Sequence, residues 1–187
     1  MTDNALIDRF VETLNERGFE SLPEQEVPPE LRVGVPNDFG WCNWKMCAVG
    51  SNPWVAGLEQ SLAPYRFPIL YLSLISRYRF AEFEADPILF LANTGQGVFH
   101  ELADCIHKDP VMSPVLLKQG LLQFARPDSV RYDPICFAAA KMKNGDAPIV
   151  QIDHEDILSF NRKGRIVAEI APSFRRFVEQ VIAGEMA

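Results

Sequence analysis

Four consecutive titratable side chains, Asp153-His154-Glu155-Asp156, form the densest cluster of their kind in the chain. Carboxylates beside an imidazole could hold a cation, or act as acid and base in a small hydrolase built on Asp153 and Glu155. The structural alternative is that Asp153 or His154 ends a strand, while Glu155 and Asp156 place negative charge in the first turn of a short helix. The pattern favours this structural role.

A second arrangement with nucleophilic potential pairs Cys136 with His154, which would face each other if their segments formed a hairpin. A catalytic thiol needs solvent exposure and an electropositive setting to become a thiolate. Cys136 instead lies between Ile135 and Phe137 in an apolar run, and Cys105 also lies in one. We expect both cysteines to be buried and to pack as small hydrophobic side chains.

Zinc motifs fail on their spacing. His100-Glu101 starts like the helix of a zinc protease, but Asp104 stands one turn on, where the second histidine ligand must fall. Two cysteines and two histidines could together supply four zinc ligands, but their spacing matches no standard zinc finger or ribbon. They are Cys42, Cys47, His100 and His107. We expect no metal site, and no stoichiometric zinc or iron in the purified protein.

Nucleotide cofactors and nucleic acids are disfavoured for separate reasons. Gly95-Gln-Gly97 lacks the third glycine of a dinucleotide-binding loop, and no Gly-Lys-Ser or Gly-Lys-Thr sequence offers a nucleotide phosphate loop. The formal net charge is −7, without a basic stripe that could neutralise phosphates. We therefore expect no cofactor and no nucleic-acid partner.

The negative charge is concentrated in the first 30 residues, which carry eight acidic side chains and two arginines. This segment, with Glu12, Glu16 and Glu20, could attract a basic protein. The alternative is a solvated helix face that keeps the protein soluble, and the pattern favours it.

Three tryptophans offer another kind of contact, because tryptophan is enriched among residues that anchor interfaces, although it lies more often in the core. The candidate binding residues are Trp41, Trp44, Trp54, Asp153, His154, Glu155 and Asp156. We expect one acidic group, either that of residues 12–20 or that of residues 153–156, to share a cleft beside the sheet with at least one tryptophan.

Helical periodicity and capping signals place the helices. Residues 3–18 form an amphipathic pattern that ends at Gly18, and residues 19–38 hold four prolines, as in an extended surface connection. Asn52-Pro53 predicts the start of a helix over 54–62, capped by Asn52. Further helices are expected over 69–78, 99–107 and 110–119, and from Pro172 onward.

The strands are expected to cluster around hairpins. Residues 83–92 suggest one buried strand bent at Asp86-Pro87, and others are expected at 121–125 and 166–168. Residues 132–137 and 148–153 should pair as antiparallel neighbours, joined by a loop that contains Asn144-Gly145. Such strands, with helices before and after them, predict an α+β fold. We expect an acidic N-terminal helix and proline-rich connection (1–40) packed on an α+β domain (41–187), in one globular unit.

Membrane and secretory signals are lacking in the sequence. The longest apolar run, Ile69 to Ile75, is far shorter than the roughly 18–20 residues of a membrane span. The N-terminus shows no basic region leading into an apolar stretch, and the four cysteines are too scattered for a disulfide framework. We expect a cytoplasmic protein without a membrane partner.

Several segments occur in an order and spacing that match a known family. They are Leu62-Ala-Pro-Tyr-Arg66, Phe90-Leu-Ala-Asn-Thr-Gly95, Tyr132-Asp-Pro-Ile-Cys-Phe137, Pro148-Ile-Val-Gln-Ile-Asp-His-Glu155 and Glu169-Ile-Ala-Pro-Ser-Phe-Arg-Arg-Phe-Val178. Together they resemble the SUKH superfamily, in its Smi/Knr-type bacterial branch, over about residues 41–183. One departure is Arg77-Tyr-Arg-Phe80, which stands where the family usually has Asn-Gly-Gly.

The resemblance implies one curved, mainly antiparallel sheet flanked by helices, and a non-enzymatic protein-binding role. Many bacterial members are immunity proteins, which bind and neutralise toxin domains such as nucleases and deaminases, while others are regulatory interaction modules. The family has no fixed catalytic set, so no residue here inherits a role. The implied partner is another protein, with a basic toxin domain as the first hypothesis and a regulatory or housekeeping partner as the second. The sequence leaves the partner's identity and the oligomeric state open.

Overall fold

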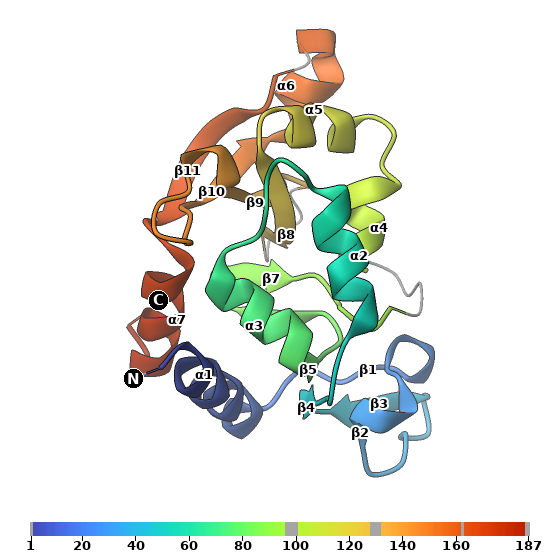
Figure 1. The fold of residues 1–187 in the computed structure, drawn as a ribbon. Coiled ribbons are helices and arrows are strands. Elements are labelled where there is room, and N and C mark those ends of the chain that lie inside the picture. Colours follow the sequence, from blue (N-terminus) through green and yellow to red (C-terminus); the bar gives the residue numbers. More distant parts are fainter. Residues whose placement is uncertain (1, 96–100, 128–131, 162, 186–187) are drawn as a thin grey trace.

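A six-stranded antiparallel sheet forms the centre of the protein, in the order β11-β10-β9-β8-β7-β6. The structure is a computed structural model that describes residues 2–95, 101–127, 132–161 and 163–185. The strands are β6 (Phe83–Ala85), β7 (Ile88–Phe90), β8 (Leu121–Pro127), β9 (Ile135–Ala138), β10 (Ile149–Asp153) and β11 (Arg165–Ala171). Each strand pairs with its neighbour in the sequence (Figure 1), and the α+β fold expected from the sequence is confirmed.

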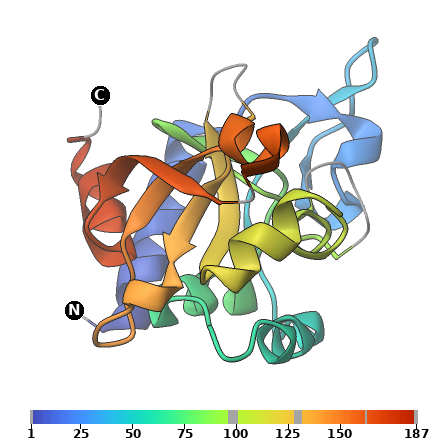
Figure 2. The same ribbon diagram turned by 90° about the horizontal axis from the view of Figure 1, so that it is seen from above.

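Helices cover both faces of this sheet. Figure 2 shows α1 and α7 on one side and α4 and α5 on the other. The helices are α1 (Asp3–Arg17), α2 (Pro53–Ser61), α3 (Ile69–Arg77), α4 (Leu102–His107), α5 (Met112–Lys118), α6 (His154–Asp156) and α7 (Phe174–Ala183). Helices α1, α3 and α7 contact one another, whereas α5 packs on the opposite face together with the π-helical turn η4 (Ile157–Asn161). A 3-10 turn, η3 (Ala139–Lys141), follows β9.

Side chains alternate between the two faces along the central strands, as a pleated sheet requires. On β10, Ile149 joins the large core under α1, α3 and α7, while Val150 and Ile152 join the smaller core under α5. Aromatic rings fill the large core, where Phe124 stacks on Phe137 with ring centroids 3.9 Å apart. The sheet is thereby held between two apolar layers.

The hairpin predicted around Asn144-Gly145 is confirmed. Strands β9 and β10 pair in antiparallel register, with Ile149 opposite Phe137, although β9 begins at Ile135 rather than at residue 132. Asn144 and Gly145 adopt positive φ angles of 52° and 78°, the left-handed conformation that these two residue types tolerate best.

Three finer expectations were wrong. Residues 83–92 do not form one bent strand, because the chain reverses at Asp86-Pro87 and β6 pairs with β7. A turn suits a proline, which has no N–H to give to a strand partner. Asn52 occupies the N-cap position of α2 and Pro53 its first turn, as expected, but the Asn52 side chain makes no capping bond, and its amide instead donates to the Ile75 carbonyl at 2.6 Å. Cys136 lies opposite Val150 in the register, and not opposite His154.

A second, small sheet lies at the end of the molecule remote from α6 (Figure 1). Its order is β1-β3-β2. Strands β1 and β2, from the expected N-terminal segment (1–40), therefore pair with β3, from the expected α+β domain (41–187). The strands are β1 (Leu22–Pro23), β2 (Arg32–Val33) and β3 (Trp41–Trp44), with 3-10 turns η1 (Glu24–Glu26) and η2 (Pro29–Leu31) between the first two. Strands β4 (Cys47–Ala48) and β5 (Tyr78–Arg79) form a separate pair. Across the described ranges, no helix has both the length and the apolar character to cross a membrane.

Candidate functional site

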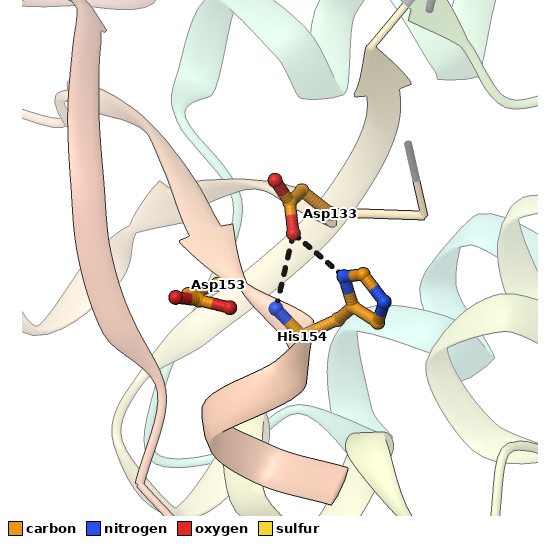
Figure 3. A group of neighbouring side chains, drawn as sticks. All are labelled: Asp133, Asp153 and His154. Carbon is orange, nitrogen blue, oxygen red and sulfur yellow. Dashed lines mark hydrogen bonds and ion pairs between the residues drawn. The ribbon is translucent and has the colours of Figure 1, made fainter. Parts of the chain in front are cut away.

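The cluster around His154 is organised by Asp133, an acid that precedes β9. One oxygen of Asp133 accepts hydrogen bonds from His154 Nδ1 at 2.7 Å and from the His154 backbone N–H at 3.1 Å (Figure 3). The other oxygen accepts a hydrogen bond from Gln151 Nε2 at 2.9 Å. Asp133 is buried, so its charge depends on these donors. The pair of bonds to His154 fixes the start of α6 at the end of β10.

These contacts also determine the charge of Asp133. Burial alone would raise the pKa of its carboxyl group, but hydrogen bonds from His154 and Gln151 outweigh burial and hold the pKa below its ordinary value of 3.8. An ionised carboxylate only accepts hydrogen bonds, so His154 Nδ1 must donate. The other ring nitrogen, Nε2, lies 3.4 Å from an Oε1 oxygen of Glu155.

The predicted acids Asp153 and Asp156 are both engaged in structural contacts. Asp153 caps α6, since one of its oxygens accepts the Glu155 backbone N–H at 3.0 Å. Its other oxygen pairs with Arg165 of β11, and Arg165 Nε also reaches Asp156 at 2.5 Å. The structural role expected from the sequence is confirmed, because Asp153 ends β10 while Glu155 and Asp156 lie in the first turn of α6. The capping by Asp153 and the ion pair of Asp156 with Arg165 were not predicted.

Among the described residues, Asp133, Asp153 and His154 form the one set of three potential metal ligands, with their ligand atoms within 4.8 Å of one another. A metal ion bound there would have to displace His154 and Gln151 from Asp133, and Arg165 from Asp153. Metal-ligating carboxylates and histidines normally turn their lone pairs toward the ion. This set is therefore arranged as a hydrogen-bonded network, and the absence of stoichiometric zinc stays a prediction that elemental analysis can test.

An imidazole held by a carboxylate at Nδ1, with Nε2 turned outward, has the orientation of a general base. Base catalysis would also require a position for a substrate or nucleophile next to Nε2. Here Glu155 lies next to that nitrogen, and the neighbouring aromatic ring is the exposed Tyr132, with centroids 6.3 Å apart. Three pockets of the described residues, beside β6, on α1 and beside β11, are lined by other parts of the chain.

The two cysteine-based hypotheses find no support in the geometry. Cys136 is fully buried, and burial raises the pKa of its thiol far above the ordinary range, so it stays protonated. Among the four hypothetical zinc ligands, Cys42 is buried in β3, and His107 Nε2 lies 3.0 Å from Ser61 Oγ. His100 lies outside the described residues.

The three tryptophans have different environments. Trp44 is buried, stacks on Phe19 with centroids 4.3 Å apart, and donates its indole N–H to the Glu20 carbonyl at 3.1 Å. Trp54 is partly buried in the first turn of α2, whereas Trp41 is 45% exposed. Only Trp41 therefore presents a large part of its side chain to a partner.

Trp41, a candidate binding residue from the sequence, belongs to an exposed apolar group whose other members were not predicted. We call this group the loop patch, and its members are Val33, Val35, Phe39 and Trp41. They lie on the β2–β3 hairpin, and Val35 and Phe39 are 88% and 87% exposed. The sequence does contain a signal, because Val35 and Phe39 lie between Gly34 and Gly40 in a short loop, where no helix or strand face can bury them.

The acidic groups do not join the tryptophans in the cleft that was expected. Glu12 and Glu16 line a shallow hollow on α1, and Glu20 lines a pocket of ≈ 410 Å³ beside β6. No tryptophan lines either of these two pockets. Figure 1 places α6, which holds three of the four residues of the 153–156 cluster, and β3, which begins at Trp41, at opposite ends of the molecule.

Comparison with known proteins adds no relative from which a role could be carried over. The chain matches no protein-family model, no curated protein sequence and no solved structure. The likeness to the SUKH superfamily thus rests on the sequence motifs alone, and the site must be interpreted from its own residues.

Proposed function

We propose that this protein is a non-enzymatic protein-binding module of the SUKH type, acting in the cytoplasm as an immunity protein that binds and neutralises a toxin domain. The family part of the proposal rests on the sequence motifs. Three of these motifs fall on β9, on β10 with α6, and on β11 with the start of α7, which are consecutive elements of the fold. In that position they supply strand pairing and packing, as expected of a family without a fixed catalytic set.

The observation that carries the binding role is the loop patch. Isolated exposed apolar residues are normal, but a group of them on one projecting segment is typical of a protein contact. Two of the four are aromatic, the type that most often anchors an interface. A basic toxin domain also suits the formal net charge of −7.

The competing hydrolase hypothesis would use Asp153 and Glu155. Both oxygens of Asp153 are engaged, one by the α6 backbone and one by Arg165. The Glu155 side chain is 76% exposed, whereas catalytic groups normally act in a site from which water is excluded. These contacts favour binding over catalysis.

A regulatory or housekeeping interaction protein of the same fold is the second candidate. It would use the same loop patch, so the two candidates differ in the partner and not in the surface. The neighbouring genes distinguish them, because a toxin gene immediately upstream is expected only for an immunity protein.

The test is co-expression of that upstream gene with and without this protein. An immunity protein restores growth and co-purifies with the toxin domain in a stable complex. If the upstream product is not toxic, or if it remains toxic in the presence of this protein, the immunity proposal is rejected and the regulatory candidate takes its place.

A further inference from the structure

We propose that the loop patch is an anchor that inserts Phe39, flanked by Val35 and Trp41, into an apolar pocket on a basic protein partner. This inference rests on the proposed function, which it deepens by naming the surface and the chemistry of the partner. Its evidence is the exposure of the patch, the hydrogen bonding of the loop that carries it, and the charge around it.

The exposure of the patch is concentrated in nine residues. Val33, Val35, Phe39 and Trp41 are 44%, 88%, 87% and 45% exposed, and all lie between the end of β2 and the start of β3. In Figure 2 this loop, in light blue, projects from the body of the molecule. Exposed aromatic side chains that project in this way can fill a partner's pocket, and central anchors of this kind carry most of the energy of an interface.

Hydrogen bonds within the loop hold it in one conformation. The Asn37 side-chain oxygen accepts the backbone N–H groups of Phe39 and Trp41, both at 3.0 Å. The Asn37 backbone N–H donates to the Trp41 carbonyl at 2.8 Å, and the Gly40 N–H donates to the Asn37 carbonyl at 2.9 Å. Gly34 and Gly40 have φ angles of 77° and 74°, which other residues rarely adopt. A loop fixed before binding loses little conformational entropy when a partner docks.

The base of the loop is fixed to the core. Along β3, exposed Trp41 and Asn43 alternate with buried Cys42 and Trp44. Trp44 stacks on Phe19 and bonds to the Glu20 carbonyl, which joins β3 to the segment after α1. The same strand therefore buries one face and presents Trp41 on the other.

The charge around the patch indicates a basic partner. Residues 20–45 carry five acidic and two basic side chains. Arg32 is paired with Glu24, and Glu30 with Arg79. In contrast, Asp38, which lies beside Phe39 at the exposed tip, makes no ion pair or side-chain hydrogen bond with any residue that the structure describes.

This charge also argues against two other occupants. An anionic lipid surface would be repelled by the acidic side chains around the loop. A second copy of the chain would bring two acidic surfaces together. A basic protein with an apolar pocket satisfies both the aromatic tip and the acidic surroundings.

The partner can be captured at the patch itself. We would place the photoreactive residue p-benzoylphenylalanine at position 39 of the full chain, and at position 111 as a control. Val111 is also an exposed apolar residue, at 48% against 87% for Phe39, and it lies on the segment before α5, outside the loop patch. Irradiation in the native cell should give a discrete adduct with a basic protein from position 39 and not from position 111.

The captured protein is then purified and its binding kinetics are measured. Phe39→Ser should weaken the affinity at least tenfold, mainly through faster dissociation, while Val111→Ser changes it less than twofold. Asp38→Lys should slow association and reduce its dependence on salt. Since Phe39 and Asp38 are exposed, these variants should fold, which circular dichroism would verify.

The outcomes separate this inference from the proposed function. If tagged wild-type protein binds a protein partner with an affinity that Phe39→Ser leaves unchanged, the binding role stands and the loop patch is not the anchor. If no protein partner binds at all, the proposed function fails. Binding of wild-type protein to phosphatidylcholine vesicles that Phe39→Ser abolishes would overturn the protein partner in favour of a membrane.

Discussion

Asp133 is the residue on which the α6 end of the sheet depends. Its two oxygens accept three hydrogen bonds, two from His154 and one from Gln151. A buried carboxylate is tolerated only when its charge is compensated in this way, and the donors in turn depend on it. The cluster of residues 153–156, a candidate catalytic group in the sequence, therefore helps to connect β9, β10 and α6 in the fold.

Replacing Asp133 tests this connection. Asp133→Ala leaves the half-buried donors of His154 and Gln151 without an acceptor, and each such loss costs ~1–3 kcal/mol. We expect the free energy of unfolding, measured in urea, to fall by about 2–3 kcal/mol. Asp38→Ala serves as the control, because a substitution on the exposed surface should change stability by at most about 0.5 kcal/mol. An equal loss of stability in both variants would contradict the structural role of Asp133.

The pH dependence of stability provides a second test of Asp133. Its pKa in the folded protein lies below the ordinary value of 3.8, so the unfolded chain binds the proton more tightly. The stabilisation is thus complete above that value and is lost as the pH falls through the folded pKa. The difference in unfolding free energy between wild type and Asp133→Asn should shrink between about pH 5 and about pH 2. Burial raises the pKa of Glu101, but Glu101 titrates in both proteins, so its contribution cancels from the difference in unfolding free energy. A difference that grows in acid would contradict the network.

The contacts of individual residues also predict how much metal the purified protein contains. The carboxylates of Asp133 and Asp153 are already satisfied by protein donors, so a bound ion would have to break those contacts. We expect elemental analysis of the purified protein to find far less than one zinc or iron per chain. Nearly one metal per chain would revive the cysteine and histidine site and end the binding-only account.

At the scale of the elements, local sequence signals predicted most helices and the central hairpin. The apolar spacing of residues 3–18 and the Asn144-Gly145 turn are short-range patterns, and α1, β9 and β10 follow them. The reversal at Asp86-Pro87 was missed, because an apolar run that continues past a proline resembles a single strand until its pairing is known. The two-residue strands β1 and β2 gave no pattern at all, since they exist only through their pairing with β3.

The close packing around Gly120, at the junction between α5 and β8, can be tested by substitution. Gly120 has a φ angle of 66°, and a Cβ atom there would lie 2.6 Å from Tyr65 Cε1 and 2.9 Å from Ala140 Cβ. Gly120→Ala combines a left-handed backbone, at roughly 1–2 kcal/mol, with overpacking. We expect the unfolding free energy to fall by about 2 kcal/mol or more.

The matched control is the same substitution in a helix. Gly57 lies in α2 with no heavy atom within 4 Å of an added Cβ and without a positive φ angle. Gly57→Ala should be neutral or should stabilise the protein by ~0.5–1 kcal/mol. If Gly120→Ala behaves like Gly57→Ala, the packing of Tyr65 and Ala140 at this junction is wrong.

At the scale of the whole molecule, residue types could be identified from the sequence but their neighbours could not. Asp153 and His154 were singled out, yet Asp133 was missed, because its approach depends on the exact register between β9 and β10. Asn144-Gly145 forms a two-residue turn between the bridged residues Lys143 and Asp146, but residues 139–148, including η3, separate β9 from β10, so the turn sequence does not set that register. Phe39 and Val35 were overlooked because exposure is a property of the assembled fold.

The charge distribution and the loop patch together define the molecule as a binder in our account. The segment up to residue 45 supplies both the acidic surroundings and the aromatic tip, and Trp44 of β3 fixes the base of the loop to the core. Electrostatic attraction would speed encounter, and the apolar tip would slow dissociation. The two effects are separable by salt and by substitution.

Quantitative co-purification from the native cell tests the central claim most directly. Tagged wild type, Val111→Ser and the double variant Val35→Ser/Phe39→Ser would be recovered side by side, and bound proteins quantified by mass spectrometry. We predict that one basic protein is retained in near-stoichiometric amount by wild type and Val111→Ser, and is depleted at least tenfold from the double variant. Recovery of no protein above the background of an untagged strain would contradict the claim that this chain is a protein-binding module.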